Sequence, residues 1–292
     1  MARSKDPLRI GIQVVVYVAL YFLSATLGGA LFLWLGGYLL GVTVSGLVAA
    51  IFANWLSLRI HEDAHLPDLG LWWHRPSADN LAFGLAGGIG AASLVMIGPL
   101  VTGGAHFVRT PQPGSWDSAA FLAVMLAAGA AGEELFFRGY GFQVLLAAVG
   151  PYAAVLPVGV AFALLHTGNP NANWFGIANT AGFGILFGYA YLRSRDLWLP
   201  IGLHFGWNLT LPLFGVNLSG ITLKVTGYEL TWSAGKLWSG GAYGPEASVL
   251  TSAVLAVLFV YLYKAPIRRQ VSPLTDPPAE RALCEPAPPL AS

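Results

Sequence analysis

The sequence has little charge and almost no cysteine. Only 10% of its 292 residues are Asp, Glu, Lys or Arg, whereas soluble domains average about 25%. With 55% hydrophobic residues and a mean hydropathy of +0.63, this deficit excludes an ordinary soluble fold and predicts a polytopic membrane protein. The single cysteine, Cys284, excludes an internal disulfide and a metal site built from several cysteines.

Long apolar runs dominate the chain. A helix needs about 20 apolar residues to cross a bilayer, and eight segments approach or exceed that length. The sequence therefore predicts an all-α membrane bundle of about eight transmembrane helices. The predicted spans are 10–35, 38–58, 80–102, 118–147, 150–168, 174–192, 197–214 and 247–263.

Basic residues gather on one side of these predicted spans. With a cytoplasmic amino terminus, eleven Lys and Arg residues fall on the cytoplasmic side and three on the outer side. The positive-inside rule then places both termini in the cytoplasm. The apolar run after the basic start "MARSKDPLR" is too long for a cleaved signal peptide, so the first span is expected to be retained. Short loops without a targeting motif favour a bacterial cytoplasmic membrane.

Four regions are predicted from these features. Residues 1–117 hold three spans and an interfacial loop, 118–214 a core of four spans, 215–263 an outer loop and the last span, and 264–292 a Pro-rich disordered tail. The alternating piece "ITLKVTGYELTW" in the outer loop leaves two options open, a hairpin about Gly227 or an irregular loop.

The stretch "GEELFFRG" places three charges after an uncharged run. Each ionised side chain in hydrocarbon costs at least about 2.5–3.5 kcal/mol, so functional importance is the default explanation. Glu134 and Arg138 are four residues apart on a helix and are expected to form a salt bridge. Glu133 diverges from Arg138 and becomes the candidate general base.

Three more polar residues lie at depth in the predicted spans. His166 ends the stretch "FALLH", 16 residues after a turn near residue 150, and Glu133 lies 17 residues before that turn. The two side chains are therefore expected at the same depth on neighbouring antiparallel helices. His204 and Asn208 of "HFGWN" are one helical turn apart. A carboxylate, two imidazoles and an amide are the groups needed to activate a water and stabilise an oxyanion.

These motifs resemble those of the CPBP family, which comprises type II CAAX prenyl endopeptidases, bacteriocin-processing enzymes and lysostaphin-resistance-like proteins. The pattern E-E-x-x-x-R is present as "EELFFR", F-x-x-x-H as "FALLH" and H-x-x-x-N as "HFGWN", and the resemblance covers roughly residues 118–210. It implies a bundle of eight helices and a glutamate-dependent intramembrane endopeptidase. The implied catalytic residues are Glu133 and His166, which activate the water, and His204 and Asn208, which stabilise the oxyanion. The implied supporting residues are Glu134, Arg138 and Phe162.

The resemblance leaves the cofactor and the substrate open. Glu133, His166 and His204 would make a His₂Glu zinc site, but glutamate-dependent chemistry in the family favours no metal. The implied partner is a membrane-associated peptide or protein in the lipid bilayer, either prenylated or a bacteriocin or pheromone precursor, and no nucleic acid is implied.

Two rival interpretations compete with this one. The segment "HEDAH", from His61 to His65, satisfies the zinc-protease pattern H-E-x-x-H, but it lies at the end of a span and Pro67 follows closely. The other interpretation is a transporter or a non-catalytic scaffold that uses the buried polar cluster for binding. The paired interrupted spans typical of many transporters are not evident in the sequence.

Overall fold

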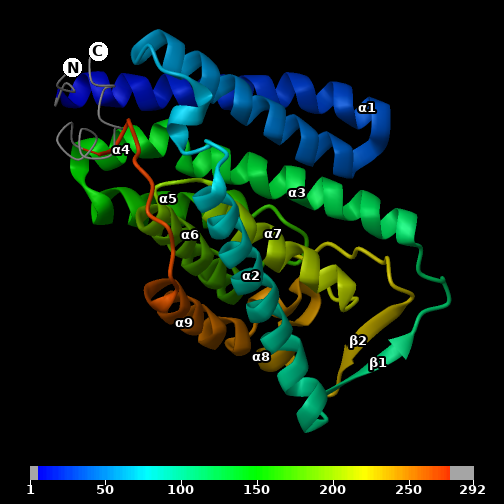
Figure 1. Ribbon diagram of the computed structural model, residues 1–292. Helices are drawn as coiled ribbons and strands as arrows, with labels where there is room; N and C mark the ends of the chain where they lie inside the picture. Colours follow the sequence, from blue (N-terminus) through cyan, green and yellow to red (C-terminus); the bar gives the residue numbers. More distant parts are fainter. Residues whose placement is uncertain (1–5, 277–292) are drawn as a thin grey trace, which may run out of the picture.

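The computed structural model describes residues 6–276 and is mostly helical (Figure 1). Four helical stretches are long and apolar enough to cross a membrane. The all-α membrane class is therefore confirmed, whereas the number of eight spans stays a prediction. The four stretches are α1 (Pro7–His61), α2 (Arg75–Thr102), the consecutive helices α3 (Trp116–Arg138) and α4 (Tyr140–Val149) taken together, and α6 (Trp174–Ser194).

Shorter helices and one small sheet complete the described part of the chain. The helices are α5 (Pro151–Leu165), α7 (Trp198–Leu213), α8 (Lys236–Ser239) and α9 (Val249–Lys264). Three 3₁₀ turns are η1 (Leu66–Leu69), η2 (Gly241–Tyr243) and η3 (Pro245–Ala247).

Helix α1 consists of two arms that run in opposite directions. Gly36 and Gly37 have non-helical dihedral angles, and Gly37 has a φ of 78°, which favours glycine. Figure 1 shows the chain reversing there, so that the second arm returns beside the first. The arms correspond to the first two predicted spans.

The fourth predicted span, 118–147, is broken. Gly139 has a ψ of −143°, so α3 ends at Arg138 and α4 starts at Tyr140. A Cβ at residue 139 would lie 2.1 Å from the carbonyl oxygen of Leu135 and 2.3 Å from Oδ1 of Asn54. The close approach of Asn54 therefore requires glycine at the break.

The outer loop forms neither the hairpin about Gly227 nor a wholly irregular loop, the two options that its sequence leaves open. Strand β2 (Tyr228–Trp232) pairs antiparallel with β1 (Ala105–Arg109), which follows α2, and Ala105 lies opposite Trp232. The alternating pattern indicated a strand, but its partner lies more than a hundred residues earlier in the sequence. The sheet thus joins the loop after α2 to the loop before α9 (Figure 1).

Helices α2 and α7 pack backbone to backbone through glycines. On α2, a Cβ added to Gly84 would lie 2.3 Å from a carbonyl oxygen of α7, and one added to Gly88 would lie 2.2 Å from another. On α7, the corresponding distances to carbonyl oxygens of α2 are 2.6 Å for Gly202 and 2.8 Å for Gly206. Spacing of four residues on each helix is the small-residue pattern that lets membrane helices approach closely. This packing fixes α7 against α2.

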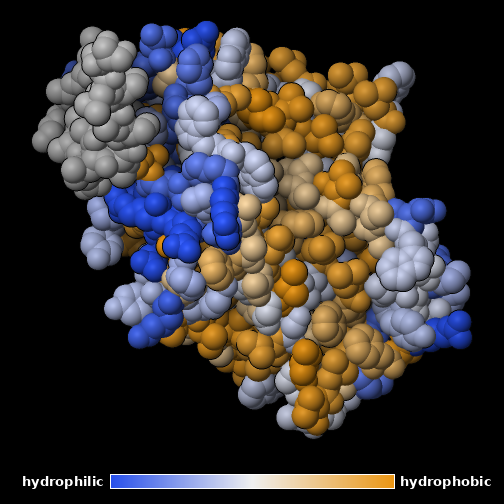
Figure 2. Space-filling view, viewed as in Figure 1, coloured by the Kyte–Doolittle hydropathy of each residue, from blue (hydrophilic) through white to orange (hydrophobic). Residues whose placement is uncertain are grey.

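The surface divides into an apolar band with polar ends. Figure 2 shows hydrophobic residues spread over the middle of the molecule, with hydrophilic residues gathered near the start of α1 and again near the sheet. The start of α1 and the segment after α9 lie on the same side of the bundle (Figure 1). This arrangement fits an integral membrane protein.

The predicted disordered tail is wrong for its first part. Residues 265–276 pack against the helix ends: both the N–H and the carbonyl of Arg268 bond to the side-chain amide of Asn80, at 2.9 and 2.7 Å, and Ser272 is fully buried. Extended backbone is held there because Asn80 satisfies its polar groups. Residues 277–292, which include Cys284, lie outside the described residues.

Substituting Ala for Gly88 should destabilise the protein by about 1–3 kcal/mol, because the added methyl group overpacks the contact with α7. A Cβ on Gly90 of the same helix would meet no other atom within 4 Å, so Gly90→Ala is the matched control. Thermal unfolding in detergent should show a lower midpoint for Gly88→Ala alone. Equal midpoints for the two variants would contradict the packing described.

Candidate active site

Glu134 is the polar centre at which α3 and α7 meet. Its side chain is fully buried, its Oε1 accepts a hydrogen bond from Nδ1 of His204 at 2.9 Å, and both its oxygens lie 3.2 Å from Nη1 of Arg138. The predicted Glu134–Arg138 salt bridge is confirmed. The sequence did not indicate the bond to His204, which ties the two helices together.

Arg138 is fully buried, and its charge is compensated on several sides. Besides Glu134, its Nη2 donates to the carbonyl oxygen of Gly184 on α6 at 2.6 Å. Three aromatic rings lie 5.2–5.6 Å from the guanidinium carbon, within the range of cation–π attraction. They are Phe137, Phe162 and Phe187. A buried ion pair needs such additional partners because desolvation of both charges is costly.

Glu133 faces both histidines. Its Oε2 lies 3.8 Å from Nε2 of His166 and 3.9 Å from Nε2 of His204. The same oxygen is buried and has no hydrogen-bond partner, although the side chain as a whole is 38% exposed. These separations are too long for direct hydrogen bonds and suit a bridging water. The partial exposure leaves the site open to a substrate, and Glu133 is less desolvated than a fully internal residue.

The tautomer of each histidine is fixed by the hydrogen bond that its Nδ1 makes. Nδ1 of His166 lies 2.7 Å from the carbonyl oxygen of Phe162, which can only accept a hydrogen bond. Nδ1 of His204 lies against Glu134, and a carboxylate likewise accepts. Both Nδ1 atoms therefore carry the proton. In the neutral rings, each Nε2 presents its lone pair toward Glu133.

Aromatic side chains hold both imidazoles in place. The ring of Phe162 lies 4.5 Å from that of His166, and Phe187 stacks on His204 at 4.8 Å. Phe162 thus contacts both the Arg138 guanidinium and His166. Asn208 lies one turn beyond His204 and is half-buried, and its side chain makes no hydrogen bond within residues 6–276. Its amide is therefore available to a ligand.

Two residues of α1 that sequence analysis missed hold the end of α3. Nδ2 of Asn54 donates to the carbonyl oxygen of Leu135 at 3.0 Å, and Oδ1 accepts from the N–H of Tyr140 at 2.7 Å. The hydroxyl of Tyr17 lies 3.0 and 2.9 Å from the carbonyl oxygens of Leu135 and Phe136. The carbonyl oxygen of Leu135 also keeps its bond from the N–H of Gly139. The groups freed by the break are the N–H of Tyr140 and the carbonyl of Phe136, and Asn54 and Tyr17 satisfy them. A single asparagine in an apolar span was the signal that could have identified this contact.

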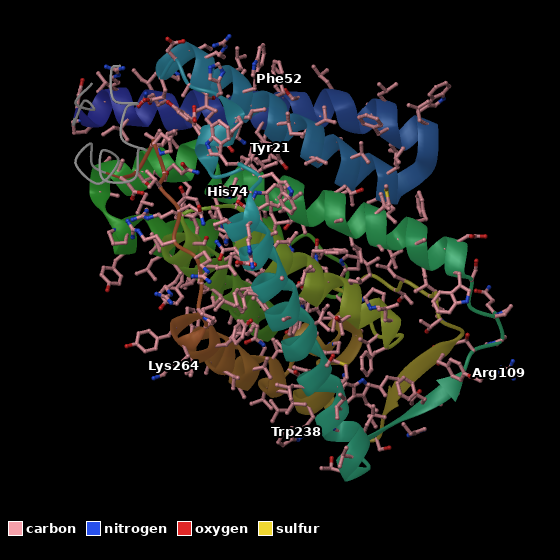
Figure 3. All side chains as sticks on the ribbon, viewed as in Figure 1. Tyr21, Phe52, His74, Arg109, Trp238 and Lys264 are labelled. Atoms are coloured by element: carbon pink, nitrogen blue, oxygen red, sulfur yellow. The ribbon has the colours of Figure 1, made fainter. Side chains whose placement is uncertain are left out.

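A further contact joins α1 to the same turn of α3. Tyr21, labelled in Figure 3, lies between α1 and α3, and its ring stacks on Phe136 with the centroids 3.7 Å apart. Gly132 packs on the second arm of α1, where a Cβ would lie 2.8 Å from the N of Leu47. Both arms of α1 therefore set the position of the turn that carries Glu133.

The "HEDAH" segment does not form a zinc-protease helix. Helix α1 ends at His61, and Asp63 has a φ of 50°, so the two histidines are not on successive turns of one helix. Glu62 accepts hydrogen bonds from Gln13 at 3.3 Å and from Tyr140 at 3.2 Å. This contact assigns Glu62 to the packing between α1 and α4.

Comparison with known proteins yields one family match. Residues 115–210 match the model described as "Type II CAAX prenyl endopeptidase Rce1-like". The predicted family resemblance is confirmed over this segment, which covers α3 to most of α7 and contains every residue of the three motifs. The comparison with curated proteins gives no match.

Substituting Leu for Asn54 should lower the free energy of unfolding by about 1–3 kcal/mol or more, because buried backbone groups at the end of α3 lose their partners. Thr26→Ala is the control, since the hydroxyl of Thr26 bonds, among the described residues, only to the carbonyl oxygen of Phe22 on its own helix. Thermal unfolding of both variants in the same detergent tests the expectation. An unchanged midpoint for Asn54→Leu would show that α3 does not depend on this contact.

Proposed function

Because residues 115–210 carry the Rce1-like domain, we propose that the protein is an intramembrane endopeptidase of the CAAX-protease type. It hydrolyses a peptide bond of a membrane-associated peptide. The observation that supports the chemistry best is the convergence of Oε2 of Glu133 with Nε2 of His166 and of His204. Glu133 lies in α3 and His204 in α7, while His166 caps the C-terminal end of α5.

Glu133 and His166 activate the attacking water. A water placed between Oε2 of Glu133 and Nε2 of His166, which are 3.8 Å apart, reaches both acceptors. The carboxylate removes the proton as the water oxygen attacks the carbonyl carbon, and the proton is later passed to the leaving amine. His166 holds the water in line because its Nδ1 is anchored to Phe162.

His204 and Asn208 stabilise the oxyanion of the tetrahedral intermediate. Since Nδ1 of His204 already donates to Glu134, donation from Nε2 requires the imidazolium form. The carboxylate of Glu134 favours that positive charge, while Arg138 balances the second half of the carboxylate. Asn208 adds an amide N–H from the next turn. Preorganised donors of this kind supply a large part of the rate enhancement in acyl transfer.

The substrate and orientation follow from the family resemblance and from the charge pattern. Prenylated peptides and bacteriocin or pheromone precursors are the candidate substrates. Both termini lie in the cytoplasm, and the protein resides in a bacterial cytoplasmic membrane. The excess of Lys and Arg in loops on the side of the termini supports this orientation.

A zinc ion fits the donor types but not the distances. Glu133, His166 and His204 form a His₂Glu set, and the buried Oε2 lacks a partner. Ligand atoms of a tetrahedral zinc lie about 3.4 Å apart, compared with 3.8 and 3.9 Å here, and the described residues hold no group of three arranged to bind a metal ion. We therefore propose that the water is activated by the protein groups themselves.

Glu133→Gln should lower kcat by at least about 100-fold, because a general base contributes roughly 10²–10⁴ to the rate. The assay uses purified protein in liposomes with a farnesylated CAAX peptide and its unprenylated form. Glu229→Gln is the matched control, since Glu229 lies on β2 and pairs with Lys224 at the surface. Undiminished cleavage by Glu133→Gln would remove the proposed base.

Dialysis against 1,10-phenanthroline should leave the cleavage rate of the wild type unchanged. Metal content measured on the same samples by mass spectrometry gives the comparison. Loss of activity that parallels the loss of zinc, and its recovery when zinc is added, would replace the metal-free mechanism with a zinc-dependent one.

A further inference from the structure

A buried carboxylate lies outside the segment matched by the family model. Glu246 is in η3, between β2 and α9, and is 7% exposed. It makes no ion pair with a Lys or Arg in the described part of the chain. Burial raises the pKa of Glu246, while hydrogen bonds from Ser219 and Trp207 and the nearby His166 act in the opposite direction. Burying a carboxylate without a cationic partner costs free energy, so the position of Glu246 needs an explanation.

Both oxygens of Glu246 bind groups next to the proposed active site. Oε1 accepts a hydrogen bond from Nε1 of Trp207 at 3.3 Å. Oε2 accepts from the backbone N–H of Ser219 and from its hydroxyl, the latter at 3.0 Å. Trp207 belongs to α7, and Ser219 belongs to the turn that follows α7. One carboxylate therefore holds the helix and the turn together.

Trp207 is well placed to control the rotation of α7. It lies between His204 and Asn208 in the sequence, and its ring packs on Phe183 of α6 with the centroids 4.6 Å apart. A bond to its indole N–H resists rotation of the turn that carries both residues. Because oxyanion donors work only within a narrow geometry, a small rotation would weaken catalysis.

The turn η3, which carries Glu246, is itself hydrogen-bonded to other helices. Nδ2 of Asn179 on α6 donates to the carbonyl oxygens of Glu246 and Ser248 at 2.8 and 3.0 Å. The hydroxyl of Thr251 donates to the carbonyl oxygen of Pro245 at 2.7 Å. The turn η3 is thus attached to α6 and α9, and Glu246 extends from a rigid base.

We propose that Glu246 is a positioning residue for the hydrolysis: it fixes α7 through Trp207 and the following turn through Ser219, so that His204 and Asn208 face Glu133. This inference rests on the proposed function. It assigns a role in the reaction to a residue beyond the matched segment 115–210.

The test compares Glu246→Gln, Trp207→Phe and the double variant with the wild type and with Glu229→Gln. Glutamine replaces one carboxylate oxygen with an NH₂ group, so it cannot accept from both Trp207 and Ser219, and the link between α7 and the following turn is broken in either orientation of the amide. Trp207→Phe keeps the ring on Phe183 and removes only the N–H, so it avoids loss of packing. We expect each single variant to lower kcat by roughly 10–100-fold with KM unchanged. The double variant should lose no more than Glu246→Gln, because both changes break the same link between α7 and the following turn. Glu229→Gln should match the wild type.

Hydrogen–deuterium exchange gives a readout that does not depend on cleavage. Peptides covering residues 214–222 should exchange faster in Glu246→Gln than in the wild type, since the turn loses either its acceptor for the amide of Ser219 or its link to Trp207. A kcat equal to that of the wild type, additive losses in the double variant, or unchanged exchange would each overturn the positioning role. A wild type that cleaves no peptide would overturn the proposed function, and faster exchange in Glu246→Gln would still establish that Glu246 anchors the turn.

Discussion

The buried contact between Glu134 and Arg138 is the interaction on which the site depends. It joins α3 to α7 through His204 and to α6 through Gly184, so three helices meet at one pair of charges. The surrounding aromatic rings and the carbonyl of Gly184 offset part of the desolvation cost. Because Nδ1 of His204 bonds to Glu134, the opposite ring nitrogen, Nε2, faces Glu133. The neighbouring glutamates thus have separate tasks, one structural and one proposed to be chemical.

Helix packing sets how accurately these groups meet. Glycines on α2 and α7 bring the two backbones together, and Gly202 and Gly206 flank His204 on its own helix. On the other side, Asn54 and Tyr17 satisfy the backbone at the break in α3 and keep its last turn from unwinding. Polar side chains in an apolar environment stabilise only when every donor and acceptor is used. Here they are used to hold a helix end beside the site.

Local patterns in the sequence predicted the contacts among the motif residues better than they predicted contacts with distant segments. The spacing of Glu134 and Arg138 gave their salt bridge, and counting residues from the turn near 150 brought Glu133 and His166 together. The bond from His204 to Glu134 could not be predicted, since it depends on the rotation of α7 against α3. The pairing of β2 with β1 and the break at Gly139 were missed for the same reason: each is decided by a distant partner, Asn54 in the second case. The Pro-rich composition of residues 264–292 predicts disorder, yet residues 265–276 are packed because Asn80 supplies the partners that their backbone needs.

The pairing of β1 with β2 has a consequence for how the molecule can be divided. It links a loop of the amino-terminal half to one of the carboxyl-terminal half, on either side of the segment that carries the three motifs. That segment also leaves behind α2, the partner of α7, and α1, the support of α3. The segment that carries the three motifs is therefore not an independent folding unit. If it were excised, it would lack the helices that give its side chains their geometry.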